Sequence, residues 1–503
     1  MAFETNKFSV TKKTKLSFSD FSVECNVSVG SDIGKILSVG VKATDDNYET
    51  LNGVLNYSGT VDLKLVFLTD SGEIGSSCHS CNFSSKFENE DIVTGQEAII
   101  SLSVIDYQIE NISGDSVRIV VNINQSAVIC EEKEVDSITC NDDDVCLSNE
   151  EIEVVKLLAS KKEVFDVESE LNIKDNIKKI LCSESQVMLK SVESGVNFVS
   201  VQGEVTTKIL YLTDEDKFES FYVNESFKEE IEVEGVSREN LVEAYLKVKE
   251  DGVSTQIDES EKGQVLTVKV PVIAFVRVYQ NELVSVVKDL YSLKNEISIS
   301  TESFENSIVC PLMTIEEKIE GNLTLDEDAP RVDKVLFFCG NNVNLTNIYV
   351  EDDKIHVEGI AKTNVVYLND ETNSLNSVQV EVPFTVSEKF DNGCNGAITA
   401  NAIVTDVDVV VKKGRDLYYD AKVKINLICA HDSISAVISQ ANANDLLPEK
   451  DYAMEVLFAQ KDQNAWDIAK SAHVSVEQIM LQNPELVFPL EEDTSVILYY
   501  KKI

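Results

Sequence analysis

The amino-acid sequence predicts a mainly β protein, built from three tandem β-rich, sandwich-like repeats followed by a small β-α-α-β module. Two observations predict this fold. Strands with alternating apolar residues recur with a period near 150 residues, and the C-terminal segment holds two short helical patterns between two apolar strands. A chain of 503 residues, of which 43% are hydrophobic, has the length for three or four domains and the composition for several cores.

A short pattern opens each repeat: a β-branched residue, any residue, Lys, a β-branched residue and Leu. It places Lys35, Lys179 and Lys334 at equivalent positions, 144 (179 − 35) and 155 (334 − 179) residues apart. Lysines in such positions edge a strand and pack their aliphatic stems flat on the sheet. We therefore expect these three lysines to be structural.

A glycine and a strand with an acidic end follow the lysine in each repeat. Gly203 precedes the strand 209–214, and Gly359 precedes the strand 365–370. In the first repeat Gly53 stands at a longer distance before its strand. We expect Gly203 and Gly359 to serve turns, because glycine adopts backbone conformations that other residues avoid.

Each repeat closes with an alternating strand. The apolar positions are Val117, Ile119, Val121 and Ile123 in the first repeat, Leu266, Val268 and Val270 in the second, and Ala421, Val423, Ile425 and Leu427 in the third. A period of two is typical of a strand with one buried face. At the openings of the second and third repeats the spacing is helical, so residues 154–158 and 286–290 are predicted to form helices.

These patterns divide the chain into six segments. The predicted segments are the first repeat over 1–130, an acidic linker over 131–150, the second repeat over 151–283, the third repeat over 284–439, a second linker over 440–451 and the C-terminal module over 452–503. A period near 150 residues is far longer than the units of solenoid proteins, so the repeats are interpreted as separate tandem domains.

Two capped helices define the C-terminal module. Asn464 precedes the first helical pattern and can accept a hydrogen bond from the first turn. Ser475, with Gln478 three residues later, begins the second helix with a capping-box pattern. The dipeptide Asn483-Pro484 ends that helix, because a residue before proline avoids the helical region.

The net charge of −44 argues against nucleic-acid and anionic-membrane partners, which bind basic surfaces. The N-terminus shows no apolar segment behind basic residues, so we expect a protein that stays in the cytoplasm of the cell that makes it. The 11 Cys are expected to be reduced thiols. The single C-x-x-C, Cys78 to Cys81, lacks a second pair for zinc, so neither a metal nor a cofactor is expected.

The C-terminal module resembles a LysM domain, a β-α-α-β unit that binds polymers or partner proteins and carries out no chemistry. The resemblance rests on residues 460–470, 474–479 and 483–486 between the two strands. Where the family has Gly-Asp-Thr, this chain has Asp462-Gln463-Asn464. Asp tolerates a left-handed turn and Asn caps a helix, so the fold is expected to survive the change. The altered loop favours a protein partner over a glycan.

Six residues of this module are candidate partner contacts. The single Trp, Trp466, is either an aromatic residue of a small core or the partly exposed centre of a binding surface, where Trp is enriched. His473, between the helices, is a second candidate, with a surface position without a role as the alternative. Lys461 could pair with an acidic patch of a partner. The other three candidates are Asp462, Gln463 and Asn464.

The repeats resemble SPOCS domains of endospore-forming Firmicutes through the Lys-Ile-Leu strand, the glycine and the Tyr-Leu-x-Asp strand, with Phe67 in place of Tyr in the first repeat. Over nearly its full length the chain is similar to the SipL-type spore-coat morphogenetic proteins of clostridia. The resemblance implies an adaptor whose LysM domain docks onto a coat ATPase of the SpoIVA type and whose repeats help to assemble other coat proteins. It also implies a location in the mother-cell cytoplasm, with recruitment to the forespore surface and spore coat.

The alternative is a glycan-binding protein that uses the LysM groove on cortex or cell-wall peptidoglycan. An enzyme is not expected. The sequence contains no phosphate-binding loop, no dinucleotide fingerprint, no His-Glu-x-x-His and no nucleophile elbow. Its four His are dispersed along the chain, so they suggest no catalytic or metal cluster.

Overall fold

The computed structural model describes residues 3–173, 176–215, 217–260, 263–372, 374–390 and 393–500. The protein is mainly β, as predicted, and the strand pairs within the described sheets are antiparallel. The predicted first repeat begins, and the predicted C-terminal module ends, in residues outside the described part. Within the described part no helix is long and apolar enough to cross a membrane.

One strand order occurs three times along the chain. The strands of the first unit are β1 (Glu4–Ser28), β2 (Ile33–Leu51), β3 (Val54–Thr69), β4 (Ile74–Glu88), β5 (Glu97–Ser113) and β6 (Ser116–Thr139). Here β2, β3 and β4 form a three-stranded meander, and β6 lies between β1 and β5 in a second sheet. The first and last strands of the unit are therefore neighbours.

The second and third units have the same two sheets: a three-stranded meander, and a second sheet in which the last strand lies between the first strand and the strand before the last. In the second unit the strand before the last is divided in two, and in the third unit the first strand is divided in two. The second unit consists of β7 (Val145–Ile173), β8 (Ile177–Ser194), β9 (Phe198–Thr213), β10 (Phe218–Glu232), β11 (Leu241–Val248), the short 3₁₀ helix η1 (Glu250–Gly252), β12 (Ser254–Ser260) and β13 (Gly263–Ser292). The third unit consists of β14 (Asn295–Val309), β15 (Met313–Thr324), β16 (Val332–Glu351), β17 (Lys354–Asn369), β18 (Leu375–Lys389), β19 (Ile398–Lys413) and β20 (Asp416–Leu446).

Each unit has its own core between its two sheets. The predicted closing strands lie in β6, β13 and β20. The apolar residues that the sequence analysis names in these strands are at most 2% exposed. Those residues belong to three separate hydrophobic clusters, one for each unit. The prediction of strands with one buried face is confirmed at these positions.

The three meanders also pack against one another at the centre of the molecule. A shared cluster contains Val66 of β3, Leu210 of β9 and Val366 of β17, together with residues of the neighbouring strands. The residues on either side of these three, such as Leu65 and Phe67, belong instead to the core of their own unit. The central strands are thus buried on both faces, which explains their continuous apolar runs.

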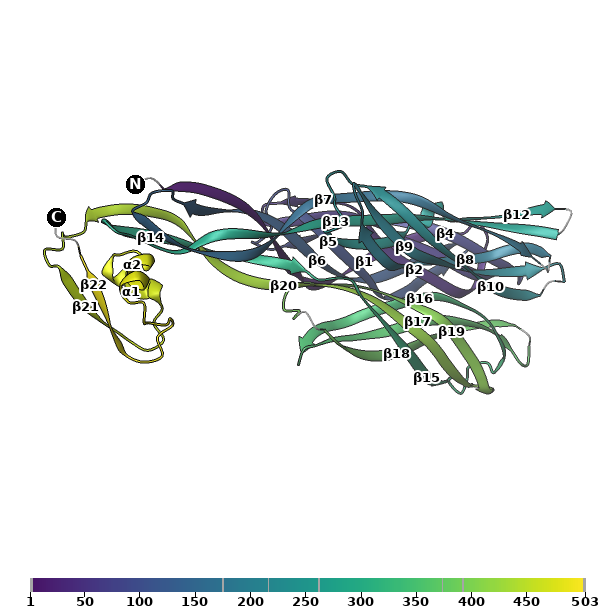
Figure 1. Cartoon of the computed structure of the whole chain (residues 1–503). Helices are drawn as coiled ribbons and strands as arrows, with labels where there is room; N and C mark the ends of the chain where they lie inside the picture. The colour runs from purple at the N-terminus through teal and green to yellow at the C-terminus, as the bar shows by residue number, and fades with distance from the viewer. Residues whose placement is uncertain are drawn as a thin grey trace.

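Beyond the cores, the paired ends of the long strands form a narrow stalk of three ribbons, β1 with β6, β7 with β13 and β14 with β20 (Figure 1). The ribbons are held together by their own apolar cluster, to which each contributes two buried residues: Val10 and Val135, Val154 and Val286, and Phe304 and Val437. A second cluster lies nearer the tip. Burying these side chains between ribbons stabilises strands that would be marginal as isolated hairpins.

At the tip of the stalk lies the C-terminal module (Figure 1). Its elements follow in the order β21 (Met454–Ala459), α1 (Ala465–Ala472), α2 (Val476–Gln482) and β22 (Thr494–Tyr499), and β21 pairs with β22. Both helices begin where the sequence predicts. Asn464 accepts from the backbone of Asp467 in a full capping box, and Ser475 accepts from Gln478.

The predicted helices at 154–158 and 286–290 are wrong, because these residues lie in β7 and β13. Val154 and Val155 are both buried, one in the stalk cluster and the other in a cluster at its base. A strand buried on both faces loses its alternation and imitates helical spacing. The segments expected to be linkers are also largely strand: residues 131–139 continue β6, residues 145–150 begin β7 and residues 440–446 end β20.

Candidate functional site

The C-terminal module is attached to the stalk through α1. The carboxylate of Asp289, on β13, accepts hydrogen bonds from Trp466 Nε1 at 2.8 Å and from Lys470 Nζ at 2.6 Å. Partial burial raises the pKa of Asp289, but the hydrogen bonds from Lys470 and Trp466 outweigh it, so the pKa lies below its ordinary value. A bulge between Val287 and Asp289 in the β7–β13 pairing accompanies this contact, and bulges commonly redirect a side chain.

Two further contacts complete the attachment. Tyr291 packs edge-on against the Trp466 ring, with 4.9 Å between centroids, and donates its hydroxyl to the carbonyl of Val474 at 2.7 Å. Nδ1 of His473 lies 3.0 Å from the carbonyl oxygen of Ser292. Trp466 and His473, predicted as partner contacts, therefore contact the stalk. Sequence reasoning missed Asp289 and Tyr291, because nothing in the sequence connects them with α1.

The other predicted contacts lie in the loop before α1. Asp462 has a left-handed backbone with φ of 68°, as expected, and its N–H donates to the carbonyl of Leu490 at 2.8 Å. The Gln463 side chain accepts from the backbone of Gln460. The backbone N–H of Lys461 donates to Asp493, and its side chain is exposed. The loop is thus held by local hydrogen bonds, and the exposed Lys461 and Asp462 side chains can face a partner.

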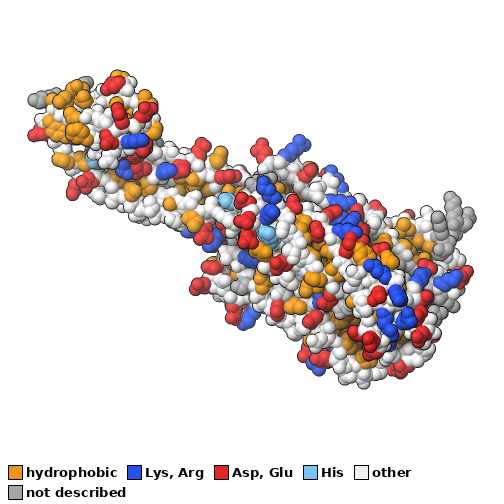
Figure 2. Space-filling view, turned by 90° about the horizontal axis from the view of Figure 1, so that it is seen from below, with side chains coloured by type: hydrophobic (Ala, Val, Ile, Leu, Met, Phe, Trp, Pro, Cys, Tyr) orange, Lys and Arg blue, Asp and Glu red, His pale blue; other side chains and the backbone are white. Residues whose placement is uncertain are grey.

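An apolar face of the module is left uncovered. The helices pack on one face of the β21–β22 pair, and the opposite face presents Met454, Val456 and Phe458 of β21 beside Tyr499 of β22. Phe458 is 86% exposed. Hydrophobic side chains gather on the surface of this module in the space-filling view (Figure 2). Exposed apolar patches of this kind mark interaction surfaces.

The three repeated lysines lie at equivalent positions of the three meanders. Lys35, Lys179 and Lys334 are exposed on the outer strands β2, β8 and β16, each opposite a leucine at the same register position. Lys35 Nζ donates to Asn376 of the third unit at 2.6 Å. The lysines thus lie at strand edges, at one end of each meander.

Gly203 and Gly359 do not form turns, so that prediction is wrong. They lie in the middle of β9 and β17, opposite Phe227 and Phe384, whose rings occupy the space above them. A Cβ on Gly203 would lie 2.5 Å from the Phe227 ring. The first-unit equivalent is Gly59, which faces Phe83 in the same way and, like the other two glycines, stands 11 residues before the acidic strand end (70 − 59, 214 − 203, 370 − 359).

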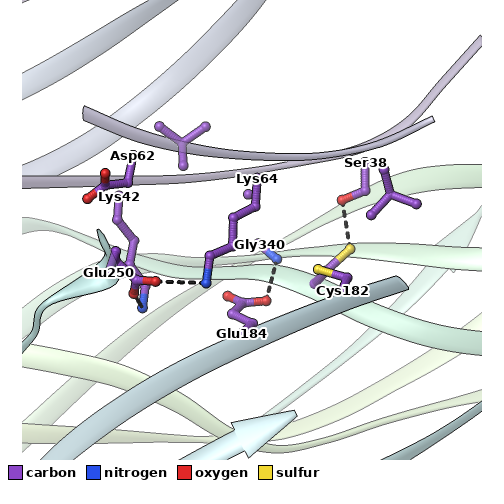
Figure 3. A pocket seen from close by; sticks show the side chains of 12 residues that line it. Ser38, Lys42, Asp62, Lys64, Cys182, Glu184, Glu250 and Gly340 are labelled. Carbon is purple, nitrogen blue, oxygen red and sulfur yellow. Dashed lines mark hydrogen bonds and ion pairs between the residues drawn. The ribbon is translucent and has the colours of Figure 1, made fainter. Parts of the chain in front are cut away.

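Buried ion pairs join the first unit to the second (Figure 3). The carboxylate of Glu250 in η1 receives Lys42 Nζ at 2.5 Å and Lys64 Nζ at 2.7 Å, and both lysines belong to the first unit. Lys64 also donates to the carbonyl of Ser183 at 2.9 Å. The space left between these groups is about 20 Å³, so the side chains around the Glu250 carboxylate pack closely.

A second buried cluster joins all three units. The carboxylate of Glu243, on β11, accepts from Lys13 Nζ of the first unit at 2.8 Å, from the Tyr279 hydroxyl at 2.8 Å and from the Tyr245 hydroxyl at 2.7 Å. The Tyr245 hydroxyl also contacts Thr399 Oγ1 of the third unit. Burial alone would raise the pKa of Glu243, but the charges of Lys13 and Arg277 lower it to about 2. The carboxylate therefore stays ionised and holds the units together.

Two segments of the chain, residues 176–258 and 331–414, match the family model described as SipL, SPOCS domain. Each segment holds the meander of one unit and the strand region that follows it, from β8 into β12 and from β16 to β19. No curated protein and no solved structure matches the chain. The match supports a sporulation-associated protein of the SipL type.

Proposed function

We propose that the protein is a non-enzymatic adaptor of spore-coat assembly. In this proposal the C-terminal module is a LysM domain that docks onto a coat ATPase of the SpoIVA type, and the three units help to assemble other coat proteins. The observation that carries the proposal is the match of two units to the SPOCS domain family. The protein would act in the mother-cell cytoplasm and be recruited to the forespore surface and the coat.

The position and surface of the module support its role in docking. It lies at the far end of a stalk, so a large partner can approach it without touching the three units (Figure 1). Its uncovered face, with Phe458 86% and Tyr499 55% exposed, offers an aromatic contact area of the kind that dominates protein interfaces. Trp466 is occupied by Asp289 and Tyr291. In the proposed complex it orients the module, and the β21–β22 face contacts the partner.

A pull-down with the purified ATPase and the intact chain tests this proposal. Phe458→Glu places a charge on the most exposed side chain of the proposed contact, and we expect at least a ~30-fold loss of affinity, since hot-spot residues contribute ~2 kcal/mol or more. Ile434→Glu is the matched control, because Ile434 is 77% exposed on the stalk strand β20. If Phe458→Glu binds as well as the unchanged chain, the proposed docking face is wrong. Sedimentation with peptidoglycan in place of ATPase binding would favour the glycan-binding alternative.

A further inference from the structure

Among the described residues, the second junction, between the second and third units, has no counterpart of the ion pair between Lys64 and Glu250 at the first. Lys64 of β3 and Lys208 of β9 are equivalent, each five residues after the strand glycine (64 − 59 and 208 − 203). Lys64 points to the next unit and meets the Glu250 carboxylate at 2.7 Å. Lys208, only 4% exposed, also points to the next unit, but its Nζ has no hydrogen-bond partner among the described residues.

Three aromatic rings surround the Lys208 ammonium. Its Nζ lies 4.1 Å from the ring centroid of Phe338 and 4.8 Å from those of Phe337 and Tyr222. Such rings attract a cation but accept no conventional hydrogen bond. Glu184 lies opposite Lys208 in the β8–β9 pairing, yet its Oε2 accepts from the backbone N–H of Gly340 at 2.9 Å. The buried charge thus lacks a carboxylate in contact.

A cavity of about 240 Å³ opens beside Lys208. Its far wall is the bulge of β19, where Thr405 and Asp406 line the space. The Asp406 carboxylate is turned away to Lys422 Nζ at 2.9 Å. Thr405 Oγ1 and Asn341 Oδ1, which also line the cavity, are buried and without a partner in the described part of the chain.

We propose that this cavity is a binding site for a small organic carboxylate, whose carboxylate group takes at Lys208 the place that Glu250 takes at Lys64. The Thr405 hydroxyl is a further donor for that group, and the side chains of Tyr222, Val404 and Val407, which line the cavity, suit an apolar body. At ~30 Å³ for each water molecule the cavity holds roughly eight waters, which is the size of a benzoate-like acid. Asn341 Oδ1 accepts from a donor of the ligand or from a water that remains beside it.

The protonation of Lys208 fits this role. Burial lowers the pKa of Lys208 to about 7, because the ammonium is removed from water without a carboxylate in contact. A bound carboxylate stabilises the ammonium, so affinity is highest below about pH 7 and falls as the free amine forms above it. The titratable groups that face Lys208 or line the cavity beside it are Glu184, Cys182, Cys339, Glu204, Tyr222, Asp406 and Lys424.

Calorimetric titration of the intact protein with benzoate, acetate and the neutral benzamide tests the proposal. We expect benzoate and acetate to bind, benzamide not to bind, and the affinity to fall about tenfold or more between about pH 6 and about pH 8.5. Lys208→Met should remove carboxylate binding, whereas Lys64→Met should retain it, because Lys64 already pairs with Glu250. Absence of binding by both acids, or equal binding by Lys208→Met, overturns the proposal.

A second measurement tests whether Lys208 lacks a partner. In the absence of ligand, Lys208→Met removes an uncompensated buried charge, so we expect the midpoint of urea unfolding to stay equal or rise. Lys64→Met leaves Glu250 with Lys42 alone, so its midpoint should fall. If Lys208→Met lowers the midpoint as much as Lys64→Met, Lys208 has a partner within the chain and no ligand is needed.

Discussion

Replacing Lys13 with Met should destabilise the whole three-unit assembly. Lys13 is the cation that pairs with the fully buried Glu243, and its side chain is 4% exposed. Met keeps the length of the side chain but leaves Glu243 to two tyrosine hydroxyls and the more distant Arg277. Removing one partner of a buried ion pair typically costs ~3–5 kcal/mol, because the remaining charge is left uncompensated.

The pKa of Glu243 gives the direction of the pH dependence. Its folded-state value of about 2 lies below the ordinary value of 4.5, and this difference corresponds to roughly 3 kcal/mol of stability. Because the folded pKa is depressed, that stability is fully present above about pH 4.5 and is lost as the pH falls towards about 2. The ionised Glu243 carboxylate therefore stabilises the fold at neutral pH, and Lys13 and Arg277 are the charges that keep it ionised.

Urea unfolding of the intact chain, at neutral pH and along a series of lower pH values, measures the effect. The control is Lys7→Met, which removes an exposed pair with Glu134 on the same strand pair and should cost ~0–1 kcal/mol. We expect a large loss for Lys13→Met at neutral pH and a smaller one in acid, where Glu243 becomes protonated. A Lys13→Met loss no greater than that of Lys7→Met would refute the claim that this cluster joins the units.

Three further predictions concern the module and the repeats. Trp466→Phe keeps an aromatic ring, though a smaller one, and removes the hydrogen bond to Asp289, worth ~1.5–3 kcal/mol as a bond to a charged group. Limited proteolysis between residues 447 and 453 should become faster, and an unchanged rate would mean that the bond does not hold the module on the stalk. Gly203→Ala forces a Cβ against the Phe227 ring and should lower stability by ~1–3 kcal/mol, whereas Gly40→Ala, where the nearest atom is 3.6 Å away, should be tolerated; equal losses would contradict the packing argument. Asn464→Ala should increase hydrogen exchange in the first turn of α1 by an amount corresponding to ~1 kcal/mol, and unaltered exchange would show that the cap contributes nothing.

The sequence predicts best where a strand has one buried face. The closing strands of the units alternate because only one side meets a core, and those positions are confirmed as buried. At residues 154–158 and 286–290 burial comes from other ribbons of the stalk. Local periodicity does not show packing between ribbons, so the sequence predicts helices where the structure has strands.

The contacts of the candidate sites depend on distant parts of the chain. Trp466 and its acceptor Asp289 are 177 residues apart, so the sequence could place Trp466 on α1 but not identify what it touches. Nothing in the sequence distinguishes Lys208 from its equivalent Lys64. The difference lies in the structure, where Lys64 forms an ion pair with Glu250 of the next unit. The sequence also points to Gly53 as the glycine of the first repeat. The equivalent residue is Gly59, which lies opposite Phe83 in the strand register.

Localisation in sporulating cells tests the adaptor proposal most directly. A fluorescent fusion of the intact chain should surround the forespore, and a fusion that lacks residues 452–503 should be diffuse in the mother cell. A Phe458→Glu fusion should follow the truncated chain, and an Ile434→Glu fusion should follow the intact one. A truncated fusion that still surrounds the forespore normally would contradict the proposal that the C-terminal module is the docking element.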